Sequence, residues 1–344
     1  MKAFSILFKP VGDRCNLSCR YCFYLGHGGG AASRDVVDAL LASYMALPFA
    51  EKSVALQGGE PLLSPEYVFD MMEAQPQLDK SVQTNATLIT DAFAERFAKN
   101  GWLVGASLDG PRESNAKRTA KDGTESFDNA VRGIRRLEKA GAEYNILSVV
   151  SHANAAKPAE TYRFLRDGFS TRFHQYIECT GPSSAEALSA DEWGGFLCGL
   201  FDEWIKADAH EISIGLFDSI VSQLVRGFPT RCASTGHCRH YFVVDWDGSI
   251  YPCDFHVRPD LRLGNVLTDS WEKIAESPLY RRFAEAKVAG LPAKCLKCRY
   301  FAFCAGDCPR SRTSDGASSL CEGWKKFFDH AMPAFERLAA GIIH

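Results

Sequence analysis

The sequence predicts an α/β fold built on a parallel β-sheet and followed by a cysteine-rich segment. Six short runs rich in β-branched or aromatic residues precede residue 180, and amphipathic stretches separate several of them. Such alternation is typical of βα units, whose strands run parallel. The alternation stops after Cys179, and the chain is rich in cysteines and turns from Arg231 to Cys321. Periodicity does not distinguish an open sheet from one curved into a partial barrel.

The predicted elements can be given by their ranges. The expected strands are Ser5–Phe8, Val54–Gln57, Ser81–Thr84, Leu103–Ser107, Tyr144–Val150 and Phe173–Ile177. The expected helices are Asp91–Lys99, Phe127–Ala140, Pro158–Arg166, Ser189–Ala207, Ile214–Arg226 and Lys325–Leu338. Apolar residues recur every three or four positions from Phe127 to Leu137, as one face of a helix requires.

Length and composition suggest how the chain is divided. Its 344 residues exceed the usual limit for one hydrophobic core. We expect a first domain over 1–229, a cysteine-rich domain over 230–322 and a final helix over 323–344. The middle segment has few long apolar runs, so bound metal is expected to stabilise it. The glycines of residues 28–32 are expected to form a flexible loop.

Charge and hydrophobicity narrow the class of protein. A formal net charge of −3 provides no basic excess for binding nucleic acid. No apolar run approaches the roughly 18 residues of a spanning helix, and the first residues do not resemble a signal peptide. We therefore expect a cytoplasmic protein without a membrane partner. In that reducing compartment, thirteen cysteines indicate metal or redox chemistry rather than disulfides.

Three cysteines directly follow the first predicted strand, with the spacing Cys15-x3-Cys19-x2-Cys22. A cubane iron–sulfur cluster has four irons, so three thiolates leave one iron open to another molecule. Ligands usually bind at this end of strands in α/β folds. The alternatives are buried thiols or a zinc knuckle, for which His27 is the only nearby fourth ligand.

Polar and glycine-containing segments end the next three strands. These segments are Gln57-Gly58-Gly59-Glu60-Pro61, Gln83-Thr84-Asn85 and Ser107-Leu108-Asp109-Gly110-Pro111. The glycines would let the backbone approach a ligand closely, and Glu60 could accept a hydrogen bond from an ammonium group. Turns and helix caps are the alternative reading of each segment.

Eight further cysteines lie between residues 230 and 322, enough for two sites with four thiolates each. They are Cys232, Cys238, Cys253, Cys295, Cys298, Cys304, Cys308 and Cys321. Two-cluster proteins often interleave their ligands, although Cys-x2-Cys pairs also occur in zinc ribbons. Cys179 and Cys198 remain, and we expect both to be ordinary buried thiols.

The first cysteine motif, followed by Phe23-Tyr24, resembles the signature of the radical S-adenosylmethionine (SAM) superfamily, and the later cysteines resemble its SPASM domain. The resemblance implies a partial (β/α)6 barrel and three [4Fe–4S] clusters. SAM would bind the open iron of the cluster held by Cys15, Cys19 and Cys22. The nearer auxiliary cluster would be held by Cys232, Cys238, Cys253 and Cys308. The more distant one would be held by Cys295, Cys298, Cys304 and Cys321.

The same resemblance implies which residues contact SAM. They are Tyr24, Gln57, Gly58, Gly59, Glu60, Gln83, Ser107 and Arg118. Tyr24 would lie near the adenine, Glu60 near the amino group and Arg118 near the carboxylate. Ser114-Asn115 replaces the His-Asp pair expected just before Arg118, which is a departure from the pattern.

Within this group the chain most resembles the anaerobic sulfatase-maturating enzymes, most tellingly at Tyr251-Pro252-Cys253-Asp254-Phe255. These enzymes oxidise a cysteine or serine of a sulfatase to formylglycine. The resemblance implies that Asp254 is the catalytic base, that the auxiliary clusters carry an electron away, and that a flavodoxin or ferredoxin-type protein donates electrons. Taken alone, Asp254 is more simply interpreted as an acceptor of backbone hydrogen bonds in an Asx turn, with a role as base as the alternative. The alternative function is modification of a ribosomal peptide by thioether, carbon–carbon or epimerisation chemistry.

Overall fold

The computed structural model describes residues 3–180 and 185–343, which divide into two compact units. Unit 1 comprises the described residues up to Ser107, then Arg118–Tyr144 and Cys238–Ala284. Unit 2 comprises Leu108–Lys117, the described part of Asn145–His237, and the chain from Glu285. Each unit is therefore assembled from segments that are far apart in the sequence.

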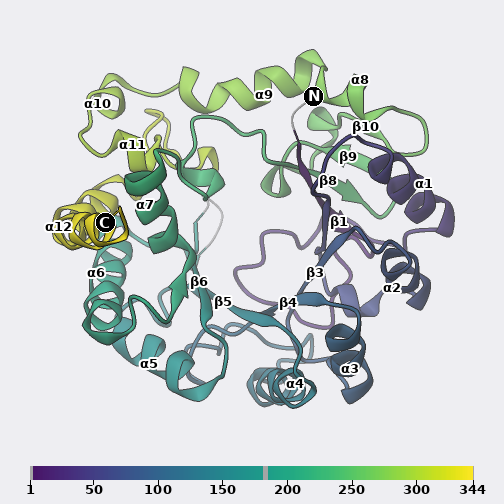
Figure 1. Ribbon diagram of the computed structural model, residues 1–344, viewed down its shortest axis with the longest axis horizontal. Coiled ribbons are helices and arrows are strands. Elements are labelled where there is room, and N and C mark those ends of the chain that lie inside the picture. Colours follow the sequence, from purple (N-terminus) through teal and green to yellow (C-terminus); the bar gives the residue numbers. More distant parts are fainter. Residues whose placement is uncertain (1–2, 181–184, 344) are drawn as a thin grey trace. The chain divides into compact units, whose positions relative to one another are not determined.

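Unit 1 contains a mixed sheet in the order β10-β9-β8-β1-β2-β3-β4. Its strands are β1 (Ser5–Lys9), β2 (Ser53–Leu56), β3 (Asp79–Thr84), β4 (Trp102–Ser107), β8 (Tyr241–Asp245), β9 (Ser249–Tyr251) and β10 (Gly264–Asn265). Neighbours from β8 to β4 run parallel, whereas β9 is antiparallel to both β8 and β10. The helices α1 (Arg34–Met45), α2 (Glu66–Glu73), α3 (Asp91–Lys99), α4 (Phe127–Ala140) and α8 (Trp271–Ala275) pack around this sheet (Figure 1).

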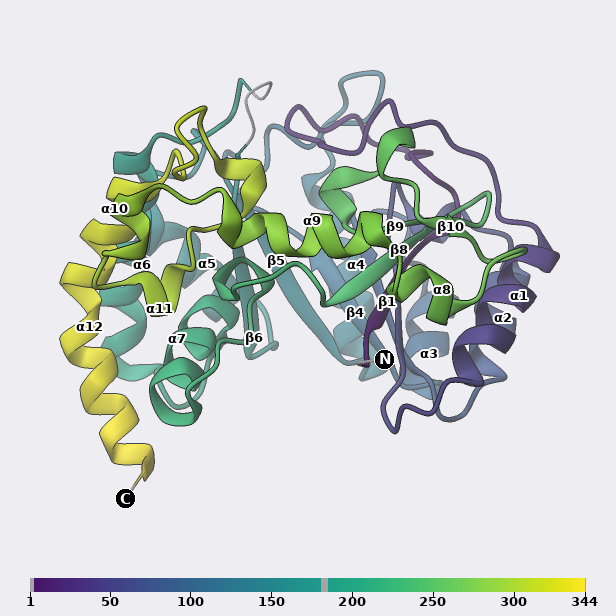
Figure 2. The same cartoon turned by 90° about the horizontal axis from the view of Figure 1, so that it is seen from above.

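Unit 2 contains the parallel strands β5 (Tyr144–Val150, apart from its first residue), β6 (Phe173–Glu178) and β7 (Ser213–Ile214). Its helices are α5 (Pro158–Gly168), α6 (Ala190–Ala207), α7 (Gly215–Arg226), α10 (Ala293–Leu296), α11 (Phe301–Cys304) and α12 (Cys321–Ile343), and α9 (Pro278–Ala289) passes from unit 1 into it. Helices α6 and α12 lie side by side in Figures 1 and 2. Glycine permits this contact, because a Cβ on Gly323 would lie 2.1 Å from the Ala190 carbonyl oxygen.

Every strand and helix predicted above is present, with ends shifted by a few residues at most in all but α12. The difference lies in the cysteine-rich segment, which adds β8, β9 and β10 to the sheet of unit 1. β8 pairs in parallel with β1 from Ser5↔Tyr241 to Lys9↔Asp245. Its Tyr-Phe-Val-Val sequence is typical of a buried strand.

Aromatic packing fastens this later segment to the first strand. The Phe4 ring lies 4.8 Å from that of Phe242 and 5.2 Å from that of Trp271, measured between centroids. The Trp271 indole also donates a 3.0 Å hydrogen bond to Ser43. Buried aromatic pairs contribute about 0.5–1.5 kcal/mol each beyond their area. No helix in the described residues is both long and apolar enough to cross a membrane.

Buried His174 on β6 should make the protein sensitive to acid. Burial lowers the pKa of His174 to about 4, below the 6.5 of an exposed histidine. The unfolded chain binds this proton at a higher pH than the folded protein does. The free energy of unfolding is therefore undiminished above pH 6.5 and decreases as the pH falls towards 4. We expect a loss of about 3 kcal/mol over this range. Urea titrations should show a smaller loss in His174→Phe; equal losses in both proteins would contradict this account.

Candidate functional site

The cysteine loop of unit 1, residues 10–22, carries Cys15, Cys19 and Cys22 and follows β1 directly. Backbone hydrogen bonds join it to the glycine motif after β2: Gly59 donates to the Gly12 carbonyl at 2.7 Å and Glu60 to the Arg14 carbonyl at 2.9 Å. A Cβ on Gly59 would lie 2.1 Å from the Arg14 oxygen. Glycine is therefore required here for the close approach of the cysteine loop, and the approach of a ligand to this segment stays a prediction.

Glu60 braces the ends of two strands from inside unit 1. Its Oε1 accepts hydrogen bonds from the Leu62 amide at 3.0 Å and the Thr84 hydroxyl at 2.7 Å, and its Oε2 accepts one from the Asn85 amide at 2.8 Å. The side chain is fully buried, and burial raises the pKa of Glu60 against the opposing effect of these donors. The structure thus gives the Glu60 carboxylate a bracing role, and its contact with SAM stays a prediction.

The environment of Cys15 suits an iron ligand. Its sulfur accepts a 3.3 Å hydrogen bond from the Leu17 amide and a 3.7 Å contact from the Asn85 side-chain nitrogen. Burial raises the pKa of the Cys15 thiol, and the charges of Glu60 and Cys22 raise it further. Iron would supply the positive charge that compensates clustered thiolates, and hydrogen bonds to sulfur tune such clusters.

Other residues predicted to contact SAM end neighbouring strands of unit 1. Gln83, near the end of β3, donates a 2.9 Å hydrogen bond to Ser107 at the end of β4. Gln57 follows β2, and its backbone N–H donates a 2.8 Å hydrogen bond to the Phe8 carbonyl oxygen. The structure brings these side chains to one edge of the sheet, where ligands bind in α/β folds. Their contacts with SAM stay predictions.

Arg118 and Tyr24 have protein partners of their own. The Arg118 guanidinium donates a 2.8 Å hydrogen bond to the Tyr21 hydroxyl, one residue before Cys22. Tyr24 is only 2% exposed, and its ring stacks on His27 at 4.8 Å between centroids. Contact of either side chain with SAM stays a prediction. Tyr21 was missed by the sequence reasoning, although it directly precedes Cys22, a predicted cluster ligand.

An ion pair between a buried lysine and a partly buried aspartate lies at the end of β1 in unit 1. The Lys9 ammonium at the end of β1 is 2.5 Å from Asp254 Oδ1, and the two side chains are 1% and 13% exposed. The ammonium also lies over the Tyr24 ring, 3.7 Å from its centroid. The Tyr24 hydroxyl donates a 3.2 Å hydrogen bond to Asp245. Sequence reasoning selected Asp254 but gave Lys9 no role at the site.

Cys238 and Cys253, two of the ligands predicted for the nearer auxiliary cluster, belong to unit 1. Burial raises the pKa of Cys253 to about 11, and the charges of Asp254 and Cys238 contribute to the rise. The Tyr241 hydroxyl lies 3.5 Å from the Cys253 sulfur. Cys232 and Cys308, the other two ligands predicted for this cluster, belong to unit 2.

Unit 2 gathers the four cysteines predicted for the more distant cluster. Burial raises the pKa of Cys304 to about 12, and the charges of Asp307 and Cys321 add to the effect. Burial also raises the pKa of Cys321, as do the charges of Cys295 and Cys298. These four thiols are therefore electrostatic neighbours, as a shared cluster requires. Among the described residues, no three or more His, Cys, Asp or Glu side chains are arranged to hold a single metal ion.

Cys179 and Cys198, the two cysteines without a predicted ligand role, differ in burial. Cys179 is buried, as predicted. Cys198 is only partly buried on α6, so its prediction was wrong in this respect.

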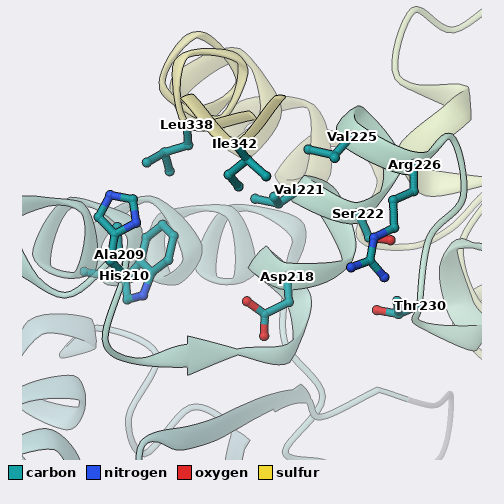
Figure 3. A pocket seen from close by; sticks show the side chains of 11 residues that line it. Ala209, His210, Asp218, Val221, Ser222, Val225, Arg226, Thr230, Leu338 and Ile342 are labelled. Atoms are coloured by element: carbon teal, nitrogen blue, oxygen red, sulfur yellow. The ribbon is translucent and has the colours of Figure 1, made fainter. Parts of the chain in front are cut away.

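A separate pocket in unit 2 lies between α7, α12 and the loop after α6 (Figure 3). Apolar side chains of Val221, Leu338 and Ile342 line it together with polar groups such as His210 and Asp218. Burial raises the pKa of Asp218, whose carboxylate accepts a hydrogen bond from Ser213. The pocket contains none of the residues predicted to bind iron, SAM or substrate.

Comparison with known proteins identifies the family. Residues 10–165 match the Radical SAM superfamily, and residues 232–299 match an iron–sulfur cluster-binding domain, SPASM. The chain is 32% identical to the serine-type anaerobic sulfatase-maturating enzyme of Bacteroides thetaiotaomicron over 100% of this chain and 93% of that protein. It is also 32% identical to the cysteine-type enzyme of Clostridium perfringens strain 13 over 99% of this chain and 100% of that protein.

A solved structure of native anSMEcpe with bound AdoMet and the Cp18Cys peptide has a TM-score of 0.92 to this chain. It is 31% identical in sequence, and the match covers 98% of this chain and 99% of that one. The predicted fold class, a radical SAM partial barrel with a SPASM domain, is thereby confirmed. The chain belongs to the anaerobic sulfatase-maturating enzymes, a family of radical SAM oxidoreductases.

Proposed function

We propose that this enzyme oxidises the Cβ of a cysteine or serine side chain in a sulfatase to the aldehyde of formylglycine. The observation that carries this proposal is the partly buried Asp254 carboxylate, which directly follows Cys253 and lies in the same unit as the first cysteine loop. Both cysteine-type and serine-type relatives support the substrate class.

The proposed reaction removes two protons and two electrons from the substrate, as one hydrogen atom, one proton and one further electron. When bound, SAM and the iron–sulfur clusters supply a radical that takes one hydrogen atom from Cβ and an acceptor for the remaining electron. Asp254 takes the proton of the thiol or hydroxyl group, which makes the substrate easier to oxidise. A cysteine substrate gives a thioaldehyde, which water converts to the aldehyde with release of hydrogen sulfide. A serine substrate gives the aldehyde directly.

Eleven cysteines would hold three [4Fe–4S] clusters. Cys15, Cys19 and Cys22 would leave one iron free for the SAM amino and carboxylate groups. Tyr24, Gln57–Glu60, Gln83, Ser107 and Arg118 would surround that cofactor. Cys232, Cys238, Cys253 and Cys308 would hold the nearer auxiliary cluster. Cys295, Cys298, Cys304 and Cys321 would hold the more distant one. A flavodoxin or ferredoxin-type protein would supply electrons, and a sulfatase peptide would be the substrate.

A peptide assay tests the proposed substrate. We expect the anaerobically reconstituted enzyme to convert a peptide carrying Cys-x-Pro-x-Arg, or its serine equivalent, into an aldehyde. Mass spectrometry should show the mass change and a further adduct after treatment with a hydrazine. SAM cleavage without modification of either peptide would contradict the proposal and favour a ribosomal peptide as the substrate.

Asp254→Asn tests the base. The amide is similar in size but cannot accept the proton, so aldehyde formation should fall by about 100-fold or more. Iron content should match that of the wild type, because Asp254 is not a ligand in the proposed sets. Asp260→Asn, which alters an exposed carboxylate paired with Arg258, is the control and should retain activity. Full activity in Asp254→Asn would remove the base assignment.

Iron analysis tests the three ligand sets. The reconstituted wild type should hold about twelve irons per chain. Cys321→Ser should lose about four of them, because one set would lack a thiolate, whereas Cys198→Ser should keep all of them. A wild-type protein that binds zinc in place of iron would refute the cluster assignment.

A further inference from the structure

We propose that Lys9 is a positioning residue that holds the Asp254 carboxylate in the orientation needed to accept the substrate proton. The inference rests on the proposed role of Asp254 as the base. It concerns a residue at the end of β1, 245 positions earlier in the chain, that contacts Asp254 through the pairing of β1 with β8.

The burial of Lys9 indicates that its charge has a specific use. A lysine that is 1% exposed pays a large desolvation cost unless its ammonium is compensated. The compensation here is the Asp254 carboxylate at 2.5 Å and the face of the Tyr24 ring at 3.7 Å. Gly58 packs closely here, because a Cβ on it would lie 2.7 Å from the Gly12 carbonyl oxygen and 3.3 Å from Lys9 Cβ.

Other buried lysines in the described residues have a different environment. Lys52 donates a 2.6 Å hydrogen bond to the Phe49 carbonyl, and Lys287 donates to the carbonyls of Cys232 and Ala233 at 2.9 and 2.7 Å. These two lysines tie down backbone segments. Lys9 instead contacts a carboxylate that directly follows a predicted cluster ligand. The contrast points to a role at the site rather than in chain architecture.

Asp254 depends on Lys9 for its orientation. Its Oδ1 is buried and receives no hydrogen bond from the described residues, so the ionic contact with Lys9 is what fixes it. Asp245, which lies opposite Lys9 in the strand register, already accepts hydrogen bonds from the Tyr24 hydroxyl and the Trp246 amide. The contacts of the Lys9 ammonium are therefore the face of the Tyr24 ring, which Asp245 holds through its hydroxyl, and the Asp254 carboxylate. Without the cation, the Asp254 side chain would be free to rotate.

Three variants separate positioning from a structural role. Lys9→Met keeps the aliphatic stem and removes the charge, Lys9→Arg keeps a cation, and Lys52→Met is the matched control at a buried lysine. We expect Lys9→Met to retain its iron and to form at least tenfold less aldehyde per 5′-deoxyadenosine released. The loss should appear in kcat rather than in the KM for the peptide. Lys9→Arg should lie between Lys9→Met and wild type, and Lys52→Met should give the wild-type ratio.

A crystal structure of Lys9→Met provides a readout independent of turnover. We expect the Asp254 carboxylate to leave its present position or to occupy a second rotamer. A wild-type ratio of aldehyde to 5′-deoxyadenosine in Lys9→Met, or an unmoved Asp254 in its crystal structure, would overturn the inference. A wild-type enzyme that forms no aldehyde would instead end the proposed function, and the crystallographic position of Asp254 would still decide the role of Lys9.

Discussion

The parallel pairing of β8 with β1 is the constraint on which the candidate site depends. Five consecutive residue pairs join a strand at the start of the chain to one from the cysteine-rich segment, and the last pair is Lys9↔Asp245. Packing of Phe4 against Phe242 and Trp271 holds the two segments together. Because β1 leads into the first cysteine loop and β9 leads into Cys253, this pairing places Asp254 in the same unit as the residues predicted to bind SAM.

Two carboxylates of unit 1, those of Glu60 and Asp254, have different surroundings. The Glu60 carboxylate accepts hydrogen bonds from Leu62, Thr84 and Asn85, and it braces the strand ends behind the cysteine loop. Asp254 has a different surrounding: a single cation contacts a buried oxygen that has no hydrogen-bond donor among the described residues. A carboxylate held in this way is oriented but not saturated, which a base requires.

Many of the helices and strands could be predicted from the sequence, because the periodicity of each element is a local property of the chain. The helix over Phe127–Ala140 and the strand over Tyr144–Val150 have clear periodicity, and the structure has both with those bounds. Long-range packing was not accessible in the same way. Residues 28–32 were expected to be flexible, yet a Cβ on Gly30 would lie 2.5 Å from the Trp246 ring, more than 200 positions away. Periodicity also cannot predict the Lys9–Asp254 contact or the close approach of the cysteine loop to Gly59. The strand β8, in contrast, has the aromatic and β-branched sequence that is typical of a strand.

The proposed reaction requires one substrate side chain to meet both the SAM site and the Asp254 carboxylate. The most direct measurement is an anaerobic crystal structure of the reconstituted enzyme with SAM and a cysteine-containing sulfatase peptide. We predict that the peptide Cβ lies next to the 5′-carbon of SAM and that its sulfur lies within hydrogen-bonding reach of Asp254. A peptide bound with its cysteine pointing away from Asp254 would contradict the account.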